Sequence, residues 1–298
     1  MRLNKHSYPS TESMPFFYDK NYNSYDKRIN SFYLNMFLDD FCSNFYINLC
    51  DNPYSSRDFF TFNGNIDKFN DIFCYDFLTH KFNKLLSNIA KNMILYGKAY
   101  VAKEIVYDNN QNIKQINYRC INCKKIRIRH KYLVYKFVNS LNYKKEHGKI
   151  SKKNCLVFDI KKVKLDEKRI INKIIKLDKY HNTTNFFSNK FFDFNHYKKT
   201  EERKQLSLTK NIYWSCRNSD NYFLSEPYLL YRQIKFYIMQ EKLLNYLVSV
   251  FNADLAFLKL KGTITYNSKV RNYGKLLDDL YSGKKNCQEV CDIIFKHI

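Results

Sequence analysis

Glycine and proline are scarce in this sequence. The 298-residue chain holds six glycines and four prolines, where average usage of about 7% and 5% would give roughly 21 and 15. Collagen-like, proline-rich and Gly/Ser-linker proteins are excluded by this shortage. No two of the glycines have the spacing of a phosphate-binding loop, a dinucleotide-binding turn or a nucleophile elbow. The sequence therefore argues against an NTP-hydrolysing motor and a Rossmann dehydrogenase.

Long apolar runs are also missing. The best short run, Tyr246 to Phe251, falls well below the roughly 20 apolar residues that a helix needs to cross a bilayer. The first 30 residues are polar and lack the apolar segment of a signal peptide. We therefore expect neither membrane insertion nor secretion. The nine cysteines are odd in number and scattered, so we expect reduced thiols in an intracellular setting rather than a disulfide framework.

Positive charge and aromatic rings are what the chain has in excess. It carries 51 Lys and Arg against 28 Asp and Glu, a net charge of +23, and 17% of its residues are aromatic. A hydrophobic content of 45% is enough to bury a core, so we expect one large or two small folded domains. Aromatic residues at core spacing favour packing over base stacking.

Apolar residues recur at three- and four-residue spacing in several segments, which predicts amphipathic helices. These segments are residues 30–50, 77–96, 225–252 and 268–281. Gly97 directly follows the second segment and suits the left-handed residue that ends many helices. In the third segment Ser225 is a candidate N-cap, and Glu226 and Pro227 suit the first helical turn.

Alternating segments predict strands, and the polar turn Asp108 to Asn112 joins two of them into a hairpin. The expected strands are 99–107, 113–119, one or two within 125–138, 211–216 and 255–261; residues 290–295 fit a short strand or a helix. Residues 141–212 differ, since they carry 19 Lys and Arg against 8 Asp and Glu with little sustained periodicity. We expect an α+β fold of long helices, a small antiparallel sheet and a basic inserted lobe.

Cys120 and Cys123 have the spacing of half a zinc site, because two thiolates two residues apart can bind one tetrahedral ion. The nearest further ligands are distant in the sequence: Cys287, Cys291, His130 and His297. The sequence therefore favours ordinary thiols and predicts no cofactor, with Cys120 and Cys123 as the remaining metal candidates.

Adjacent carboxylates occur at Asp39–Asp40 and Asp278–Asp279. Neighbours on a helix point roughly 100° apart, so they do not share one metal or substrate. These four residues are more consistent with solvated helix caps and faces.

Arg127 and Arg129 share one face of an expected strand, opposite Ile126 and Ile128. This pattern favours a half-buried strand. A basic stripe for phosphates is the alternative.

Two junctions have distinctive residues. The first is a helix ending in Leu95-Tyr96-Gly97-Lys98-Ala99-Tyr100-Val101, followed by a strand, an Asp-Asn-Asn turn and a second strand. The second is Tyr213-Trp214, a polar turn and Leu224-Ser225-Glu226-Pro227-Tyr228-Leu229, before a long helix with Glu241 and Phe251-Asn252. Over roughly residues 77–138 and 211–298 the chain resembles the portal proteins of siphophage-type tailed bacteriophages, shortened at the C-terminus.

The resemblance implies a structural virion protein and not an enzyme. Such a protein forms a closed ring of about twelve copies at one capsid vertex. Its expected partners are the packaging motor (terminase), capsid and tail-connector proteins, and double-stranded DNA that passes through the channel without sequence recognition. It is assembled in the host cytoplasm and becomes part of the virion, without a membrane.

The implied division of the chain has four parts. They are an extended arm at 1–28, a helical and β wing-like region at 29–140, a basic clip-like or linker insertion at 141–212, and a stem-like helix, strand and C-terminal helix at 213–298.

Arg232, Lys235 and Lys242 fall on one stripe of the long helix, because their three- and seven-residue spacing fits 3.6 residues per turn. We expect this stripe to line the DNA channel, with a solvated face or inter-subunit salt bridges as alternatives. The rival interpretation is a monomeric basic nucleic-acid-binding protein or nuclease that uses residues 141–212, with zinc at Cys120 and Cys123.

Overall fold

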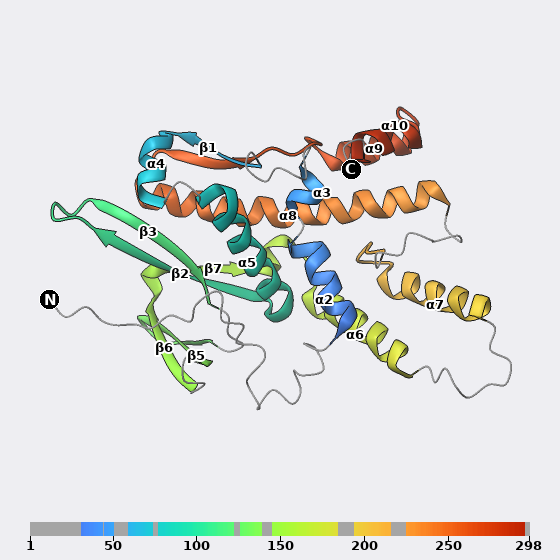
Figure 1. Ribbon diagram of the computed structural model, residues 1–298, viewed down its shortest axis with the longest axis horizontal. Helices are drawn as coiled ribbons and strands as arrows, with labels where there is room; N and C mark the ends of the chain where they lie inside the picture. The colour runs from blue at the N-terminus through green and yellow to red at the C-terminus, as the bar shows by residue number, and fades with distance from the viewer. Residues whose placement is uncertain are drawn as a thin grey trace. The chain divides into compact units, whose positions relative to one another are not determined.

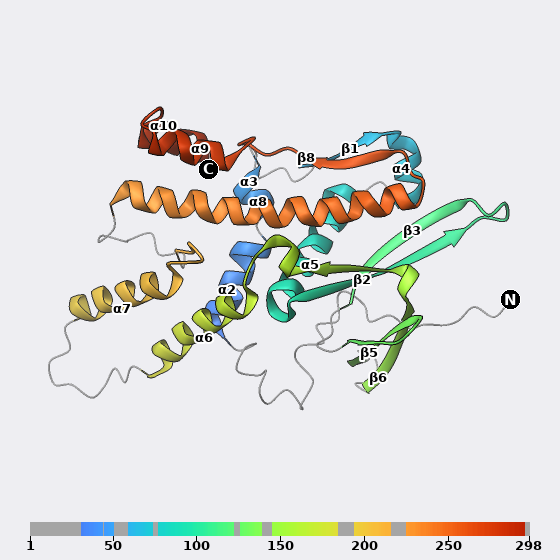
Figure 2. The ribbon, with the colours of Figure 1, turned by 180° about the vertical axis from the view of Figure 1, so that it is seen from behind.

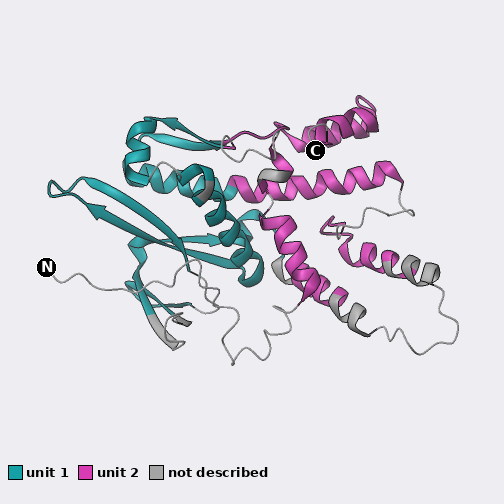
Figure 3. Ribbon diagram, in the orientation of Figure 1, with its two compact units in different colours: residues 1–27, 60–167, 246–265 teal, residues 28–59, 168–245, 266–298 magenta. Residues whose placement is uncertain are grey.

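The computed structural model describes residues 31–43, 45–50, 59–73, 77–121, 126–138, 145–183, 194–215 and 225–295. These residues form an α+β fold of two compact units, which Figure 3 colours teal and magenta. The expected arm, residues 1–28, lies outside the described residues. Within the described ranges no helix is both long enough and apolar enough to cross a bilayer.

Unit 1 contains residues 60–167 and 246–265 and holds three small sheets in its described part. Their strand orders are β1-β8, β3-β2-β7 and β4-β5-β6 (Figures 1 and 2). The elements are β1 (Phe60–Gly64), α4 (Ile66–Phe73), the π-helix η2 (Phe77–Lys81), α5 (Phe82–Tyr96), β2 (Lys98–Tyr107), β3 (Ile113–Cys120), β4 (Ile126–Ile128), β5 (Tyr132–Val138), β6 (Lys145–Ser151), the 3₁₀ turns η3 (Lys152–Asn154) and η4 (Ile160–Val163), β7 (Cys155–Asp159) and β8 (Gly262–Tyr266).

The corner between α5 and β2 confirms the expected helix and hairpin. Gly97 has a φ of 78°, which a residue with a side chain rarely adopts, and its N–H donates to the Met93 carbonyl at 2.8 Å. The chain can therefore turn back, and α5 packs against β2 and β3. Ile89, on the packed face of α5, is fully buried.

An aromatic cluster forms the centre of unit 1. Phe251, from the C-terminal part of α8 (Glu226–Phe257), meets Phe82 and Tyr118 with ring centroids 5.1 Å apart, and Phe158 at 5.6 Å. These residues come from α5, β3 and β7. The aromatic excess in the sequence thus serves packing here, as its spacing predicted.

The β4-β5-β6 sheet packs one of its faces on the β2 region. Leu133, Tyr135 and Ile150 form a buried cluster with Ala102 and Ile121. Tyr135 pairs with Gly148 across the strands, and its ring occupies the space where a Cβ on Gly148 would stand. One or two strands were expected within 125–138; β4 and β5 are found there, and β6 pairs with β5 as the third strand.

Unit 2 is helical in its described residues and comprises 28–59, 168–245 and 266–298. Its elements are α2 (Phe32–Leu38), the π-helix η1 (Asp39–Ser43), α3 (Phe45–Leu49), α6 (Glu167–Thr183), α7 (Phe194–Thr209), the N-terminal part of α8, α9 (Tyr273–Tyr281) and α10 (Cys287–Phe295). The Ser31 hydroxyl accepts from the Leu34 N–H at 3.1 Å and caps α2. Phe37 and Phe41 stack at 5.2 Å, and the Trp214 ring stands edge-on to Phe37 at 5.4 Å.

Residues 141–212 differ from the single basic insertion that we expected. Their strands β6 and β7 pair with β5 and β2 in unit 1, while most of α6 and all of α7 belong to unit 2. Each element is short or strongly charged, so its periodicity is faint, and the partners of β7 lie far away in the sequence. Composition alone therefore did not reveal that the segment contributes to both units.

Two predicted strands are wrong. Residues 255–257 continue α8, and the strand begins only at Gly262, after Lys259 adopts a left-handed φ of 57°. Residues 210–213 form a turn after α7, in which Tyr213 has a φ of 56°. At the chain's end, residues 290–295 belong to helix α10.

Candidate functional site

The N-terminal half of α8 carries the three cations that the sequence placed on one stripe. The helix begins as expected, because the Ser225 carbonyl accepts from the N–H groups of Tyr228 and Leu229 at 3.0 and 3.1 Å. Ile234, Leu243 and Leu244 are buried along its apolar side. This half of α8 belongs to unit 2.

Arg232 does not lie on an exposed stripe, which corrects the sequence prediction. Its side chain is only 2% exposed, and its Nη2 donates to Thr209 Oγ1 at 3.0 Å and to the Trp214 carbonyl at 2.8 Å. Trp214 in turn donates from Nε1 to Asp40 Oδ2 at 2.9 Å. Helical spacing does not reveal this burial, because the partners Thr209 and Trp214 lie outside α8.

Lys235 and Lys242 remain as the accessible pair. They lie seven residues apart, close to two full turns, and so share a face. Lys242 is exposed, whereas Lys235 is half-buried with its Nζ 5.7 Å from the centre of the Tyr231 ring. Tyr231 also contacts Tyr281 at 5.8 Å, so two aromatic rings adjoin Lys235. Such an arrangement can hold phosphate groups without reading bases.

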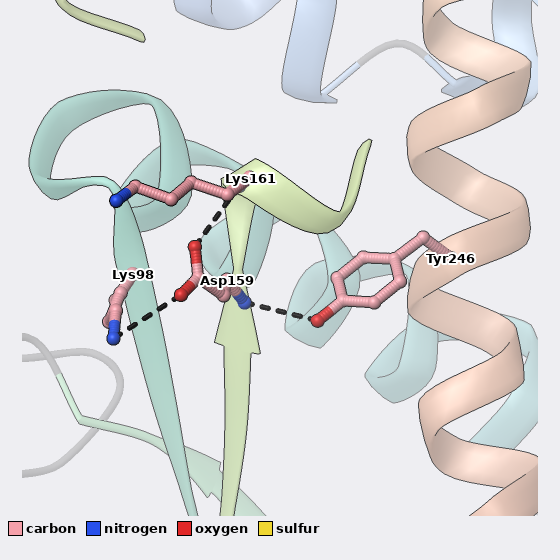
Figure 4. A network of polar contacts seen from close by, with 4 residues as sticks. All are labelled: Lys98, Asp159, Lys161 and Tyr246. Carbon is pink, nitrogen blue, oxygen red and sulfur yellow. Dashed lines mark hydrogen bonds and ion pairs between the residues drawn. The ribbon is translucent and has the colours of Figure 1, made fainter. Parts of the chain in front are cut away.

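A polar network secures the Gly97-Lys98 junction in unit 1 (Figure 4). The ammonium of Lys98 lies 3.2 Å from Asp159 Oδ2, and the Lys161 N–H donates to Asp159 Oδ1 at 3.0 Å. The Asp159 N–H donates to the Tyr246 hydroxyl at 3.1 Å. Burial alone would raise the pKa of Asp159, but the Lys161 N–H and the Lys98 charge outweigh it and lower that pKa. The network joins the end of β7 to the start of β2.

A buried ion pair was missed by the sequence analysis. Lys103 Nζ lies 2.5 Å from Asp254 Oδ1, and the Tyr118 hydroxyl donates to Asp254 Oδ2 at 2.7 Å. Burial, together with the Asp254 charge, raises the pKa of Tyr118 strongly. The available signal was a lysine within a strand of small and apolar residues, yet its partner lies on α8, far along the chain.

The cysteines do not form a metal site in the described residues. Cys120 is buried and accepts a hydrogen bond from the Asn92 amide at 3.1 Å. Burial raises the pKa of its thiol to about 12, so the thiol is protonated at neutral pH. Cys123 and His297 lie outside the described residues, and no group of three potential His, Cys, Asp or Glu ligands occurs within them.

The two pairs of adjacent carboxylates have different surroundings. Asp40 accepts from Trp214 and Asp39 from the Ser43 hydroxyl, whereas Asp278 is exposed on α9. Arg127 is exposed on β4, and Arg129 follows the strand. Ile128 is 62% exposed, so the expectation of a half-buried strand is wrong at that position.

Comparison with known proteins gives matches among solved structures. No protein-family model matches the chain, and the search of curated proteins finds no match. The fold is similar to the crystal structure of an HK97-family phage portal protein from Corynebacterium diphtheriae, at a TM-score of 0.40 and 11% sequence identity. The match covers 85% of this chain and 96% of the other.

Proposed function

We propose that this chain is a structural virion protein that assembles into a portal ring at one capsid vertex. The observation that carries the proposal is the fold of the two segments with portal-like sequence. The first forms a helix, a Gly97 corner and an antiparallel hairpin, α5-β2-β3. The second forms the long helix, strand and closing helix α8-β8-α9. The first segment has the expected order of helix, corner and hairpin, whereas in the second the strand begins at Gly262, later than the expected 255–261.

In the proposed ring, double-stranded DNA passes through a central channel during packaging and ejection. Lys235 and Lys242 are the candidates for its wall, since Arg232 is buried within the subunit. Diffuse cations contact phosphates without sequence preference, which suits DNA that has to slide. The proposed partners are further copies of this chain, the packaging motor, and capsid and tail-connector proteins.

The assembly state tests this proposal. A closed ring of identical subunits needs two different, complementary surfaces on each copy. We expect light scattering of the purified full chain to give the mass of many subunits, and electron micrographs to show closed rings. A protein that stays monomeric over the accessible concentration range would overturn the portal proposal.

The channel assignment has its own test. Rings carrying Lys235→Glu and Lys242→Glu should package DNA more slowly and with a weaker dependence on salt, because two phosphate contacts are reversed. Arg271→Glu with Lys284→Glu is the matched control, since both cations are exposed in the same unit. Unchanged packaging would remove the two lysines from the channel wall, and failure to assemble would place them at the subunit interface.

A monomeric nucleic-acid-binding protein is the second candidate. One observation favours it: the β4-β5-β6 sheet carries a set of exposed cations outside α8. A monomer that cleaves DNA in the presence of a divalent metal would support this candidate against the ring.

A further inference from the structure

The outer face of the β4-β5-β6 sheet presents a row of aligned side chains. Arg127 pairs with Val134, and Val134 pairs with Lys149, so these three residues lie side by side across the three strands. Tyr132 lies two residues before Val134 and therefore on the same face. Arg129 adjoins Tyr132, because its N–H donates to the Tyr132 carbonyl at 2.8 Å. We call these five residues the cationic face.

The charges of the cationic face are available. Arg127, Arg129 and Lys149 are exposed, and within the described residues none of them forms an ion pair. The sequence around them is one-sided: residues 126–138 and 145–155 hold eight Lys and Arg and a single Glu. Local carboxylates therefore offer little competition for these cations.

The face also presents an aromatic ring. Tyr132 is 39% exposed, and the ammonium of Lys149 lies 3.9 Å from the centre of its ring. A ring that has a cation over one face can stack on a base with its other face while the cation meets a phosphate. The combination of both groups distinguishes this face from a surface that is only positively charged.

The sheet holds these groups rigidly. Its opposite face is buried through Leu133, Tyr135 and Ile150, so the outer side chains stand on an ordered support. Neighbouring strands lie about 4.8 Å apart, and two residues along a strand advance about 6.6 Å. The latter spacing is close to twice the roughly 3.4 Å advance per nucleotide along one strand of DNA.

We propose that the cationic face binds the sugar-phosphate backbone of nucleic acid, with Tyr132 stacking on an unpaired base or end. This site is separate from Lys235 and Lys242 and does not depend on the ring. The exposed ring beside Lys149 favours nucleic acid over an acidic protein segment, which would need the charges alone. Binding is expected to be independent of sequence, because phosphate contacts and base stacking do not read base edges.

Fluorescence anisotropy of the full chain tests the site with a labelled 20-nucleotide single strand and the corresponding duplex. We expect Arg127→Glu with Lys149→Glu to weaken binding at least tenfold and to reduce the slope of log K against log salt by about 2. The control is Arg271→Glu with Lys284→Glu, which makes the same change of charge at exposed positions of unit 2. Circular dichroism confirms that each variant is folded.

Tyr132→Ala separates stacking from charge. Because stacking is worth about 1–3 kcal/mol per base, this variant should bind the single strand about tenfold more weakly and the duplex nearly unchanged. If the control variant loses as much affinity as Arg127→Glu with Lys149→Glu, the effect is one of net charge only, and the proposed site is overturned. Binding of poly-glutamate as tight as that of nucleic acid, unaffected by Tyr132→Ala, would replace nucleic acid by an acidic protein. Both results leave the ring measurement untouched, so the two proposals fail separately.

Discussion

Lys103 and Arg232 are buried to the same extent, each only 2% exposed, but their hydrogen-bond partners differ in charge. Lys103 in unit 1 meets the carboxylate of Asp254. Arg232 in unit 2 donates to neutral oxygens, those of Thr209 and the Trp214 backbone. Removing the partner of Lys103 leaves an isolated charge, whereas removing Arg232 leaves only neutral acceptors. The two sites therefore predict different sensitivities to mutation.

Asp254→Leu should have the largest effect. It leaves Lys103 charged and buried without a carboxylate, and we expect a loss of about 3–5 kcal/mol in the free energy of unfolding, measured by urea denaturation. The double variant Lys103→Met with Asp254→Leu removes both charges and should recover most of that loss. A double variant as unstable as the single one would show that packing, not charge, controls this site.

Tyr118→Phe should lower the free energy of unfolding by about 1.5–3 kcal/mol, because the charged carboxylate of Asp254 loses the hydrogen bond from the Tyr118 hydroxyl. It also predicts a pH effect. Since the folded state raises the pKa of Tyr118 above 10.0, its stabilisation is complete below that pH and is lost as the pH rises further. We expect Tyr118→Phe to flatten the alkaline fall in stability, and Tyr281→Phe, at an exposed ring, to leave it unchanged. If Tyr118→Phe loses as much stability at high pH as the wild type does, the titration of Tyr118 is not the cause of that loss.

Arg232→Met should cost about 1–3 kcal/mol, since only neutral groups lose a donor. Arg232→Lys should restore little, because a single ammonium does not reproduce the planar fork of the guanidinium. Thermal and urea unfolding provide the measurement. Wild-type stability of Arg232→Met would place this side chain at the surface and return it to the cationic stripe.

Asp159→Asn should have the smallest effect, because the carboxylate is partly exposed and its contacts with Lys98 are screened by solvent. The folded state lowers the pKa of Asp159 below 3.8, so its stabilisation is present above that pH and is lost as the pH falls through the lower, folded value. The variant should remove part of the loss of stability below pH 3.8. If the wild type and Asp159→Asn lose the same stability below pH 3.8, the contact of Asp159 with Lys98 does not contribute to acid unfolding.

Sequence periodicity predicted the elements whose signals are local. The helix ending at Gly97, the following hairpin and the start of α8 all depend on neighbouring residues, and all are found. The end of α8 was misplaced because Leu258 and Leu260 alternate with Lys259 and Lys261 as in a strand, while the helix itself continues to Phe257. The pairing of β7 with β2 joins segments that lie far apart in the sequence, and neither composition nor periodicity predicts which distant strands pair.

The candidate site was only partly predictable for the same reason. Helical spacing relates Lys235 and Lys242 correctly, but the burial of Arg232 depends on Thr209 and Trp214. Likewise, Arg127 and Arg129 were noticed in the sequence, whereas Lys149 joins them only through the register of β5 and β6.

The fit of Tyr135 over Gly148 links two positions that are far from one another in the printed sequence. A methyl group at Gly148 would collide with the ring, and a smaller residue at Tyr135 would leave a void beside a bare strand. A substitution at either position alone would therefore lower the stability of the sheet. Among descendants of this gene, we therefore expect the two codons to be retained together or replaced together, as one inherited unit.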